Sequence, residues 1–468
     1  MTSEIFELPK EPEYTGRMLV VGRPHKSSEA QRAIKNAVGL NIASSRDYEG
    51  QSVTAESIES GDGIYFDEIG VAVVTPSDAD QLGRMTTMSA LAESAEGPVL
   101  EPEQMMYALG GDYSDYVRGF RDATNALADR YAAAESWPEG ISAAEAEALA
   151  VGTTWGLQKT RTVASSPFLQ GRTGRGIKVC VLDTGMDLNH PDFAGRNITS
   201  RSFVPGEAVQ DQNRHGTHCI GTACGPKEPA DGTTDRYGVA YEADIFAGKV
   251  LSNAGSGADG WILAGINWAV ASRCEVISMS LGAMATDSGF SQAYENAALA
   301  ALNVGSLIVA AAGNDSRFGL KPVSRPANSP SIMAVGALDQ NLRRAAFSNV
   351  TFHAPHGKVD ISGPGVDVLS AIPVAMGTHG TLSGTSMATP HVAGIAALIA
   401  ESGASYRGSA LWQRLVATAE AVSGEPAGHV GSGIVQAPYL RNVIVKPLPW
   451  WWWKFFSPSG QATAQAAE

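Results

Sequence analysis

Downstream of Trp155, the chain carries short runs of consecutive apolar residues that alternate with segments of helical periodicity. Unbroken apolar runs of this length are typical of strands buried on both faces of a parallel sheet. The predicted strands span 177–182, 243–251, 274–280 and 306–312, and the predicted helices span 260–272 and 292–303. Because strands alternate with helices, we expect an α/β fold with a doubly wound, mostly parallel sheet.

Residues 17–103 show a different order of patterns. Strand-like runs and helical spacings follow one another there as strand, helix, two strands, helix and a short final strand, at residues 17–22, 28–38, 63–66, 69–74, 77–91 and 99–100. This βαββαβ order predicts a small ferredoxin-like unit. Residues 1–16 are polar and are expected to be a flexible lead-in.

Helical spacing returns over residues 104–135, where Gly110-Gly111 divides the pattern into two predicted helices. Residues 136–151 are rich in Pro, Gly and Ala and form a predicted linker with one short acidic helix. We therefore divide the chain into a lead-in, a ferredoxin-like unit, a helical insert with its linker, an α/β domain and a Trp-rich tail, at 1–16, 17–103, 104–151, 152–445 and 446–468.

Composition and charge narrow the classes of partner. The formal net charge of −14 disfavours nucleic acid and anionic membrane surfaces as general partners. The four cysteines include no C-x-x-C pair, so no zinc site is predicted; buried free thiols are the usual state in such apolar segments, and disulfides stay open. The acidic N-terminus lacks a secretory pattern, and no apolar stretch is long enough to span a bilayer. We expect a cytoplasmic protein, with non-classical export left open.

Ser386 stands in a turn of small residues, Gly384–His391, directly before a long apolar run. This pattern predicts a serine at the N-terminus of a buried helix, where free N–H groups and a partial positive charge favour an oxyanion. Most serines in this position are only helix caps, so the chemistry needs partners. Asp183 ends the first predicted strand of the parallel sheet, and His215 precedes an apolar helix.

These three residues are the parts that nucleophilic hydrolysis needs. A His of near-neutral pKa takes the serine proton and returns it to a leaving amine, and a carboxylate fixes the tautomer of that His. Asn314 follows the strand at 306–312, where its side-chain amide is placed to donate to an oxyanion.

With these residues together, the chain resembles the subtilisin-like serine proteases, or subtilases. The resemblance covers about residues 152–438 and rests on four blocks in the family's order Asp, His, Ser, at 181–185, 215–218, 311–314 and 384–394. It implies that Asp183 orients, that His215 is general base and then acid, and that Ser386 is the nucleophile. It further implies an oxyanion hole made by the Asn314 amide and the Ser386 backbone N–H, a protein or peptide substrate, and no cofactor for catalysis.

The resemblance also implies two edges of a cleft that bind an extended peptide as an added strand. One edge is Gly255-Ser256-Gly257 and the other is Ser280-Leu281-Gly282. Ala312 and Gly313 are implied as part of the pocket wall, and these small, uncharged residues permit an apolar substrate side chain without selecting one.

Within the family, the proteinase K branch is the most similar, because Cys219 follows the second His of its block and residues 329–337 and 343–349 resemble later segments of that branch. Met333 stands where the branch has a disulfide cysteine, so that bridge is absent, in agreement with a reducing compartment. The branch binds calcium through two backbone carbonyls and one aspartate. The matching positions imply a structural calcium site at Pro330, Ile332 and Asp360, and the alternative for Asp360 is an ordinary loop carboxylate.

For residues 17–103 the resemblance implies a propeptide, an intramolecular chaperone and inhibitor whose tail lies in the cleft and is cut. The insert at 104–135 is absent from the simple family pattern, and we expect the cut between 136 and 152. A self-processing zymogen of an endopeptidase is the leading interpretation. A maturation protease or transpeptidase for one peptide is the alternative, and the complete set of catalytic residues disfavours an inactive interaction protein.

Two further features have a structural and a functional interpretation. His218 and His391 lie at predicted helix starts, and we expect them to hydrogen-bond within the fold rather than to catalyse. The tail around Trp450–Trp453 is either an anchor at a membrane or partner interface or a strap on the catalytic domain. Its lack of helical periodicity favours the strap.

Overall fold

The computed structural model describes residues 11–48, 55–59, 61–78, 80–81, 83–84, 99–109, 152–163, 172–285, 289–352, 354 and 356–438. The helices predicted over 110–135, most of the one at 77–91, the linker and the Trp-rich tail lie outside these residues.

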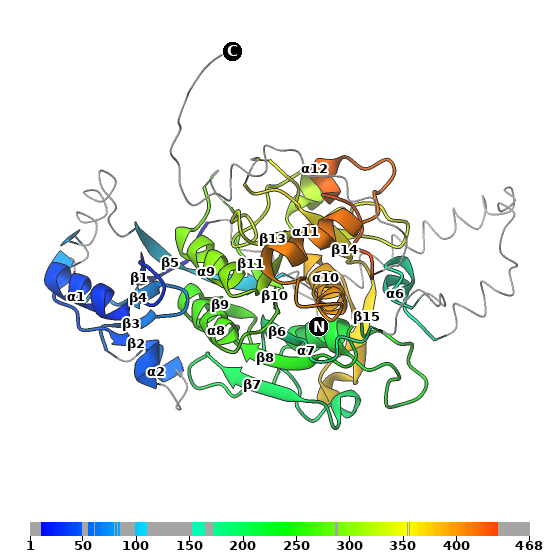
Figure 1. Cartoon of the computed structure of the whole chain (residues 1–468), viewed down its shortest axis with the longest axis horizontal. Coiled ribbons are helices and arrows are strands. Elements are labelled where there is room, and N and C mark those ends of the chain that lie inside the picture. The colour runs from blue at the N-terminus through cyan, green and yellow to red at the C-terminus, as the bar shows by residue number, and fades with distance from the viewer. Residues whose placement is uncertain are drawn as a thin grey trace, which may run out of the picture.

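Seven parallel strands form the central sheet (Figure 1). In spatial order they are β14 (Ile361–Pro364), β13 (Met333–Leu338), β12 (Leu307–Ala311), β10 (Val276–Met279), β6 (Lys178–Asp183), β8 (Asp244–Lys249) and β7 (Ile198–Ser202). The chain starts at β6, builds outward to β7 and β8, and then continues on the other side with β10. Adjacent strands that lead off in opposite directions leave a crevice at their carboxyl ends, so the β6–β10 boundary is where such folds hold their sites. The predicted α/β sheet is confirmed.

Helices cover both faces of this sheet (Figure 1). The longer ones are α7 (His215–Cys224), α8 (Asp259–Ala271), α9 (Gln292–Asn303), α10 (Thr385–Ala400) and α11 (Gly408–Thr418), and the short ones are α6 (Trp155–Lys159) and α12 (Ala427–Val430). Every residue of α10 is buried. Its small residues allow close approach: a Cβ on Gly394 would lie 2.8 Å from the carbonyl oxygen of Ala223 on α7. A short hairpin, β15 (Val368–Ala371) with β16 (His379–Leu382), leads into α10.

The N-terminal residues form a second, mainly antiparallel sheet (blue in Figure 1). Its elements are β1 (Tyr14–Val21), α1 (Ser27–Val38), β2 (Ala43–Ser44), α2 (Ala55–Glu59), β3 (Gly63–Phe66), β4 (Val71–Val74) and β5 (Val99–Ala108). The strands predicted at 17–22, 63–66 and 69–74 and the helix predicted at 28–38 are confirmed within a few residues. The patterns missed β2 and α2, which are too short for periodicity to detect.

Strand β5 corrects the prediction of a helix beginning at residue 104. The spacing of Met105, Met106 and Leu109 matches a helix, yet the chain is extended through Ala108. It pairs with β1 at one end and, at the other, with β9 (Ser256–Ala258) and β11 (Leu281–Gly282). Partners on both sides satisfy the backbone groups of an extended segment, and tertiary pairing of this kind overrides a local helical pattern.

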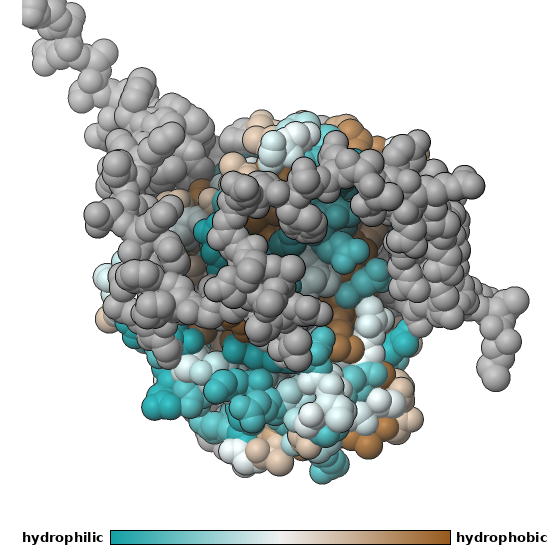
Figure 2. Space-filling view, turned by 90° about the vertical axis from the view of Figure 1, so that its right-hand side faces the viewer, coloured by the Kyte–Doolittle hydropathy of each residue, from teal (hydrophilic) through white to brown (hydrophobic). Residues whose placement is uncertain are grey.

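The N-terminal sheet lies against the side of the molecule formed by α8 and α9 (Figure 1). Phe66, Val71 and Val73 of the sheet belong to the same apolar cluster as Ile262 and Ala297 of those helices. The face in Figure 2 mixes hydrophilic and hydrophobic residues, and hydrophilic ones dominate its lower part. Among the described residues, none of the helices combines the length and the apolar character needed to cross a membrane.

Candidate active site

The predicted catalytic residues converge at the carboxyl ends of the parallel strands. Asp183 ends β6, Ser280 follows β10 and Asn314 lies just past β12. His215 begins α7, and Ser386 lies in the first turn of α10. The site therefore occupies the crevice beside the β6–β10 boundary.

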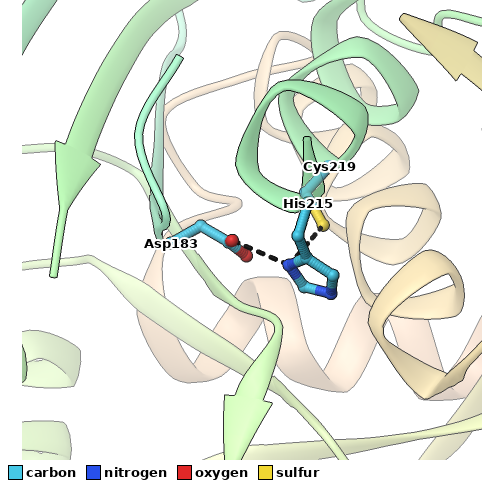
Figure 3. Close-up of side chains that lie close together, drawn as sticks. All are labelled: Asp183, His215 and Cys219. Carbon is cyan, nitrogen blue, oxygen red and sulfur yellow. Dashed lines mark hydrogen bonds and ion pairs between the residues drawn. The ribbon is translucent and has the colours of Figure 1, made fainter. Parts of the chain in front are cut away.

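Asp183 and His215 form a buried pair (Figure 3). His215 Nδ1 lies 2.7 Å from Asp183 Oδ1, and because a carboxylate only accepts, Nδ1 carries the hydrogen. Burial opposes charge on the imidazole, but the Asp183 carboxylate more than offsets this and raises the pKa of His215 well above its ordinary value of 6.5. Cys219, one turn along α7, places its Sγ 3.9 Å from the same Nδ1.

A buried carboxylate that the sequence patterns missed, Asp211, holds this pair in position. Its Oδ1 accepts from the Thr184 hydroxyl at 3.0 Å, and its Oδ2 accepts from both the backbone N–H and the hydroxyl of Thr217 in the first turn of α7. Thr184 follows Asp183 directly, and its hydroxyl also accepts from the Gly216 N–H at 2.8 Å. The end of β6 and the start of α7 are thus tied through two side chains. An Asp four residues before His215 is the available sequence signal, typical of a residue that satisfies helix N–H groups.

Ser386 is fully buried, and its hydroxyl donates to the carbonyl oxygen of Ser280 at 3.0 Å. His215 Nε2 is buried and has no hydrogen-bond partner within the described part of the chain. The serine and the imidazole are therefore not hydrogen-bonded in this arrangement. The first catalytic contact requires the Ser386 hydroxyl to turn away from Ser280.

Asn314 is oriented by Thr385, the residue before the serine. Asn314 Oδ1 accepts from the backbone N–H and from the hydroxyl of Thr385, both at 2.9 Å. This fixes which end of the amide faces the cleft, and Nδ2 donates to the carbonyl oxygen of Leu109, the residue after β5. Thr385 was not singled out from the sequence, although it lies within the block around Ser386.

Both predicted cleft edges pair with β5, so the chain's own segment occupies the cleft as a central strand. On one side Met106 lies opposite Gly257, and the Ala108 N–H donates to the Gly255 carbonyl at 2.9 Å. On the other side the Leu109 N–H donates to the Ser280 carbonyl at 3.1 Å. Ser256 and Leu281 take part in the same pairing, opposite Tyr107 and Ala108.

Leu109 packs against Gly282, where an added Cβ would lie 2.9 Å from Leu109 Cδ1. The glycine thus makes room for the apolar side chain. Ala312 and Gly313 lead from β12 to Asn314, and their N–H groups donate to the Val335 carbonyl and the Thr385 hydroxyl. These two residues support the turn that carries Asn314.

At the candidate calcium site, the carboxylate of Asp360 is already engaged by other groups. Asp360 is buried, its Oδ2 accepts from the Ala334 N–H at 2.9 Å, and its Oδ1 lies 3.1 Å from the Lys358 ammonium. Burial raises the pKa of Asp360 to about 6, and Lys358 works against that rise. A dication would have to share the carboxylate with a lysine, so the carboxylate does not fit the predicted site at Pro330, Ile332 and Asp360.

His218, His391 and the four cysteines match their structural interpretation. His218 Nε2 and His391 Nδ1 lie 2.8 Å from the carbonyl oxygens of Val368 and Met387, and burial lowers their pKa values to about 3 and about 4. Both imidazoles are therefore uncharged near neutral pH and hydrogen-bond within the fold. All four cysteines are free and buried, as expected.

Comparisons with known proteins agree with this arrangement. A family model described as "Subtilase family" matches residues 174–433. Subtilisin NAT of Bacillus subtilis subsp. natto is 38% identical over 289 residues, which are 61% of this chain and 67% of that protein. Subtilisin of Bacillus pumilus is 36% identical over 66% of this chain and 98% of its own length. M-protease of Shouchella clausii is 39% identical over 63% of this chain and 71% of its own length. The similarity to the proteinase K branch stays a prediction.

Proposed function

This chain belongs to the subtilase family of serine endopeptidases, and from that premise we propose that Asp183, His215 and Ser386 are its catalytic residues and that its N-terminal residues are its first substrate. The observation that carries the proposal is the position of Leu109. Its N–H donates to the Ser280 carbonyl oxygen, which also accepts from the Ser386 hydroxyl. Its own carbonyl oxygen accepts from Asn314 Nδ2.

In the proposed reaction, the Ser386 hydroxyl turns from Ser280 to His215 Nε2, which is neutral and takes the proton as Oγ attacks the substrate carbonyl carbon. The carbonyl oxygen becomes an oxyanion and accepts from Asn314 Nδ2 and the Ser386 N–H. Asp183 stabilises the imidazolium. His215 then gives the proton to the leaving amine, the C–N bond breaks, and water attacks the acyl-enzyme by the same steps in reverse.

The register of β5 makes Leu109–Gly110 the proposed scissile bond. Leu109 supplies the carbonyl at the proposed oxyanion hole, and Gly110 follows on the leaving side. This replaces the expectation of a cut between 136 and 152, which depended on the helical interpretation of residues from 104 onward. On this proposal, residues up to 109 are a propeptide that occupies the cleft until it is released.

The test is the fate of freshly expressed protein, followed by intact mass and N-terminal sequencing. Wild type is expected to yield a fragment that begins at Gly110, whereas Ser386→Ala protein stays full length. Ser402→Ala, in which the changed serine bonds only within its own turn, is the matched control and should process normally. A wild-type N-terminus within 136–152, or the same cut in Ser386→Ala protein, contradicts the proposal.

Subtilases need no cofactor for catalysis. We propose that Lys358, rather than calcium, balances the buried charge of Asp360, because the ammonium lies 3.1 Å from Oδ1. Calcium chelation is then expected to leave the melting temperature unchanged, while Lys358→Met lowers it. A drop on chelation that added calcium reverses would favour the metal instead.

We also propose that the protein works in a reducing compartment. Four free, buried cysteines support this proposal. Fractionation of the source cells with an antibody against residues 172–438 tests it, and recovery of the protein only from the medium would contradict it.

A further inference from the structure

Asp259 extends the hydrogen-bond ladder along the cleft beyond the point where the main chain can do so. Strand β9 ends at Ala258, which lies opposite Met105, and the next residue opens α8. There the side chain of Asp259 replaces the missing strand: its Oδ2 accepts from the backbone N–H of Gln104 at 2.9 Å. Gln104 is the sixth residue N-terminal to the Leu109–Gly110 bond, counting Leu109 as the first.

Groups outside β5 hold this carboxylate in place. Its Oδ1 accepts from the Tyr294 hydroxyl on α9 at 2.8 Å, and its Oδ2 lies 3.9 Å from Nη2 of Arg325. The main chain of Arg325 pairs with Ala283, just past β11 on the opposite edge of the cleft. The Asp259–Arg325 contact therefore links the two walls of the cleft, and the acceptor remains oriented when β5 leaves.

The charge balance around Asp259 is incomplete. Nε and Nη2 of Arg325 are buried and have no hydrogen-bond partner in the described segments. Glu103 is a second buried carboxylate nearby, but it accepts from the Gly260 N–H and is paired with Arg17. Burial raises the pKa of Asp259 to about 6, although Arg325 and the Gln104 N–H favour its charged form. Burial therefore opposes the charged form of Asp259, and the Gln104 N–H is one of the groups that offset this effect.

We propose that Asp259 is a specificity-determining residue, which accepts the backbone N–H of the sixth substrate residue and so favours peptides that extend at least six residues N-terminal to the cut. The counting of residues rests on the proposed cleavage at Leu109–Gly110. The recognised group is a main-chain N–H, so Asp259 reads the length of the substrate and not the identity of its sixth side chain. A buried hydrogen bond to a charged acceptor is expected to change kcat/KM about tenfold.

The test uses the wild-type protein after self-processing, with active sites titrated, and three p-nitroanilide peptides. The long peptide is acetyl-Gln-Met-Met-Tyr-Ala-Leu, the short one is acetyl-Met-Tyr-Ala-Leu, and the third is the long peptide with an N-methyl group on Gln. The long peptide is expected to exceed both others about tenfold in kcat/KM, because only it presents the N–H with all six residues. Equal kcat/KM for the long peptide and its N-methyl form overturns the proposal.

Removing the Asp259 carboxylate from the enzyme and the N–H from the peptide, singly and together, forms a double-mutant cycle. In Asp259→Ala the ratio of the long peptide to its N-methyl form should fall to about one, whereas Asp244→Asn, a distant carboxylate bonded to Asn197, should keep the wild-type ratio. A wild-type ratio in Asp259→Ala overturns the proposal. If Asp259→Ala does not fold, the N-methyl comparison on wild type still decides. A mature N-terminus other than Gly110 would count against the proposed function and not against this ratio, which is measured on added peptides.

The pH dependence of the ratio separates a direct contact from a merely structural role. The Gln104 N–H favours the charged form of Asp259, so a bound peptide that presents this N–H lowers the pKa of Asp259 relative to the N-methyl peptide. The ratio of kcat/KM for the long peptide to that for its N-methyl form is then largest above about pH 6 and falls as the pH drops through about 6, where Asp259 takes up a proton. Tyr294 and Arg325 face Asp259 with either peptide, and Glu103, a residue of β5, leaves with the propeptide. Asp259→Asn is expected to flatten this dependence, and an unchanged pH profile in that variant overturns the assignment.

Discussion

The catalytic centre and the cleft beside it are built in opposite ways. Among the described residues, Asp211 ties the segments that carry Asp183 and His215, and the Ser386 hydroxyl donates to the Ser280 carbonyl oxygen, so these contacts lie within residues 172–438. The cleft is instead completed by β5, whose residues come from the N-terminal sheet. The catalytic groups are therefore positioned within one region, while a strand from another region fills the cleft beside them. Substitutions at the catalytic residues should stop turnover while β5 still occupies the cleft. Substitutions along the cleft should weaken the binding of β5 and leave the catalytic residues in place.

The largest expected effect comes from breaking the buried Asp183–His215 pair. Asp183→Asn presents an amide to His215 Nδ1 and destabilises both the required tautomer and the imidazolium. Loss of the acid costs on the order of 10⁴-fold in other proteases with this triad, and a similar slowing of self-processing is expected here. Time-resolved gel analysis of refolded protein measures it. Asp339→Asn, a surface turn residue, is the control; processing of Asp183→Asn at the wild-type rate would remove Asp183 from the mechanism.

Removing the oxyanion donor is expected to have the next largest effect. Asn314→Ala leaves the Leu109 carbonyl with only the backbone donor, and loss of one such group costs about 10²–10³-fold in kcat. The loss should appear in kcat for an added peptide with little change in KM, since the interaction strengthens only as the oxyanion forms. The exposed Asn341→Ala is the matched control. An effect confined to KM would assign Asn314 to substrate binding instead.

Self-processing is expected to depend on pH through the protonation of His215. The base must be neutral, and Asp183 raises the pKa of His215 above 6.5 while β5 is seated. The rate should therefore rise about tenfold per pH unit and level off only above pH 6.5. Stopped samples across pH 5–9 give the profile. A plateau already reached below pH 6 would contradict the raised pKa.

The smallest expected effect comes from a change in how Leu109 packs against the edge of the cleft. In Gly282→Ala the new Cβ would lie 2.5 Å from the Arg325 carbonyl oxygen and 2.9 Å from Leu109 Cδ1, so the edge must shift. Overpacking of this kind is expected to slow processing at Leu109 about tenfold. Peptides with alanine in place of leucine should be affected less. Gly428→Ala, where the nearest atom is 3.7 Å away, is the control. Equal slowing for both peptides would show that the substitution acts on the centre and not on seating.

Local sequence patterns predicted those parts of the molecule that depend on neighbours in the chain. The apolar run at 177–182 predicts a buried strand, and Asp183 then lies at a strand end whatever packs around it. In the same way, the apolar run after Ser386 predicts a buried helix and a serine in its first turn. Prediction was less successful for Asp211, because its importance comes from partners at Thr184 and Thr217 on two separate elements.

Residue patterns alone predict the α/β fold, the order of its elements and the four residues proposed for catalysis, because buried strands and helix starts leave periodic signals. Contacts between distant segments were needed to establish that residues 104–108 are extended, that the Leu109 carbonyl oxygen accepts from Asn314, and that Asp259 continues the ladder to Gln104. Taken alone, a segment with the spacing of Met105, Met106 and Leu109 matches a helix. Two distant cleft edges that satisfy its backbone groups make it a strand.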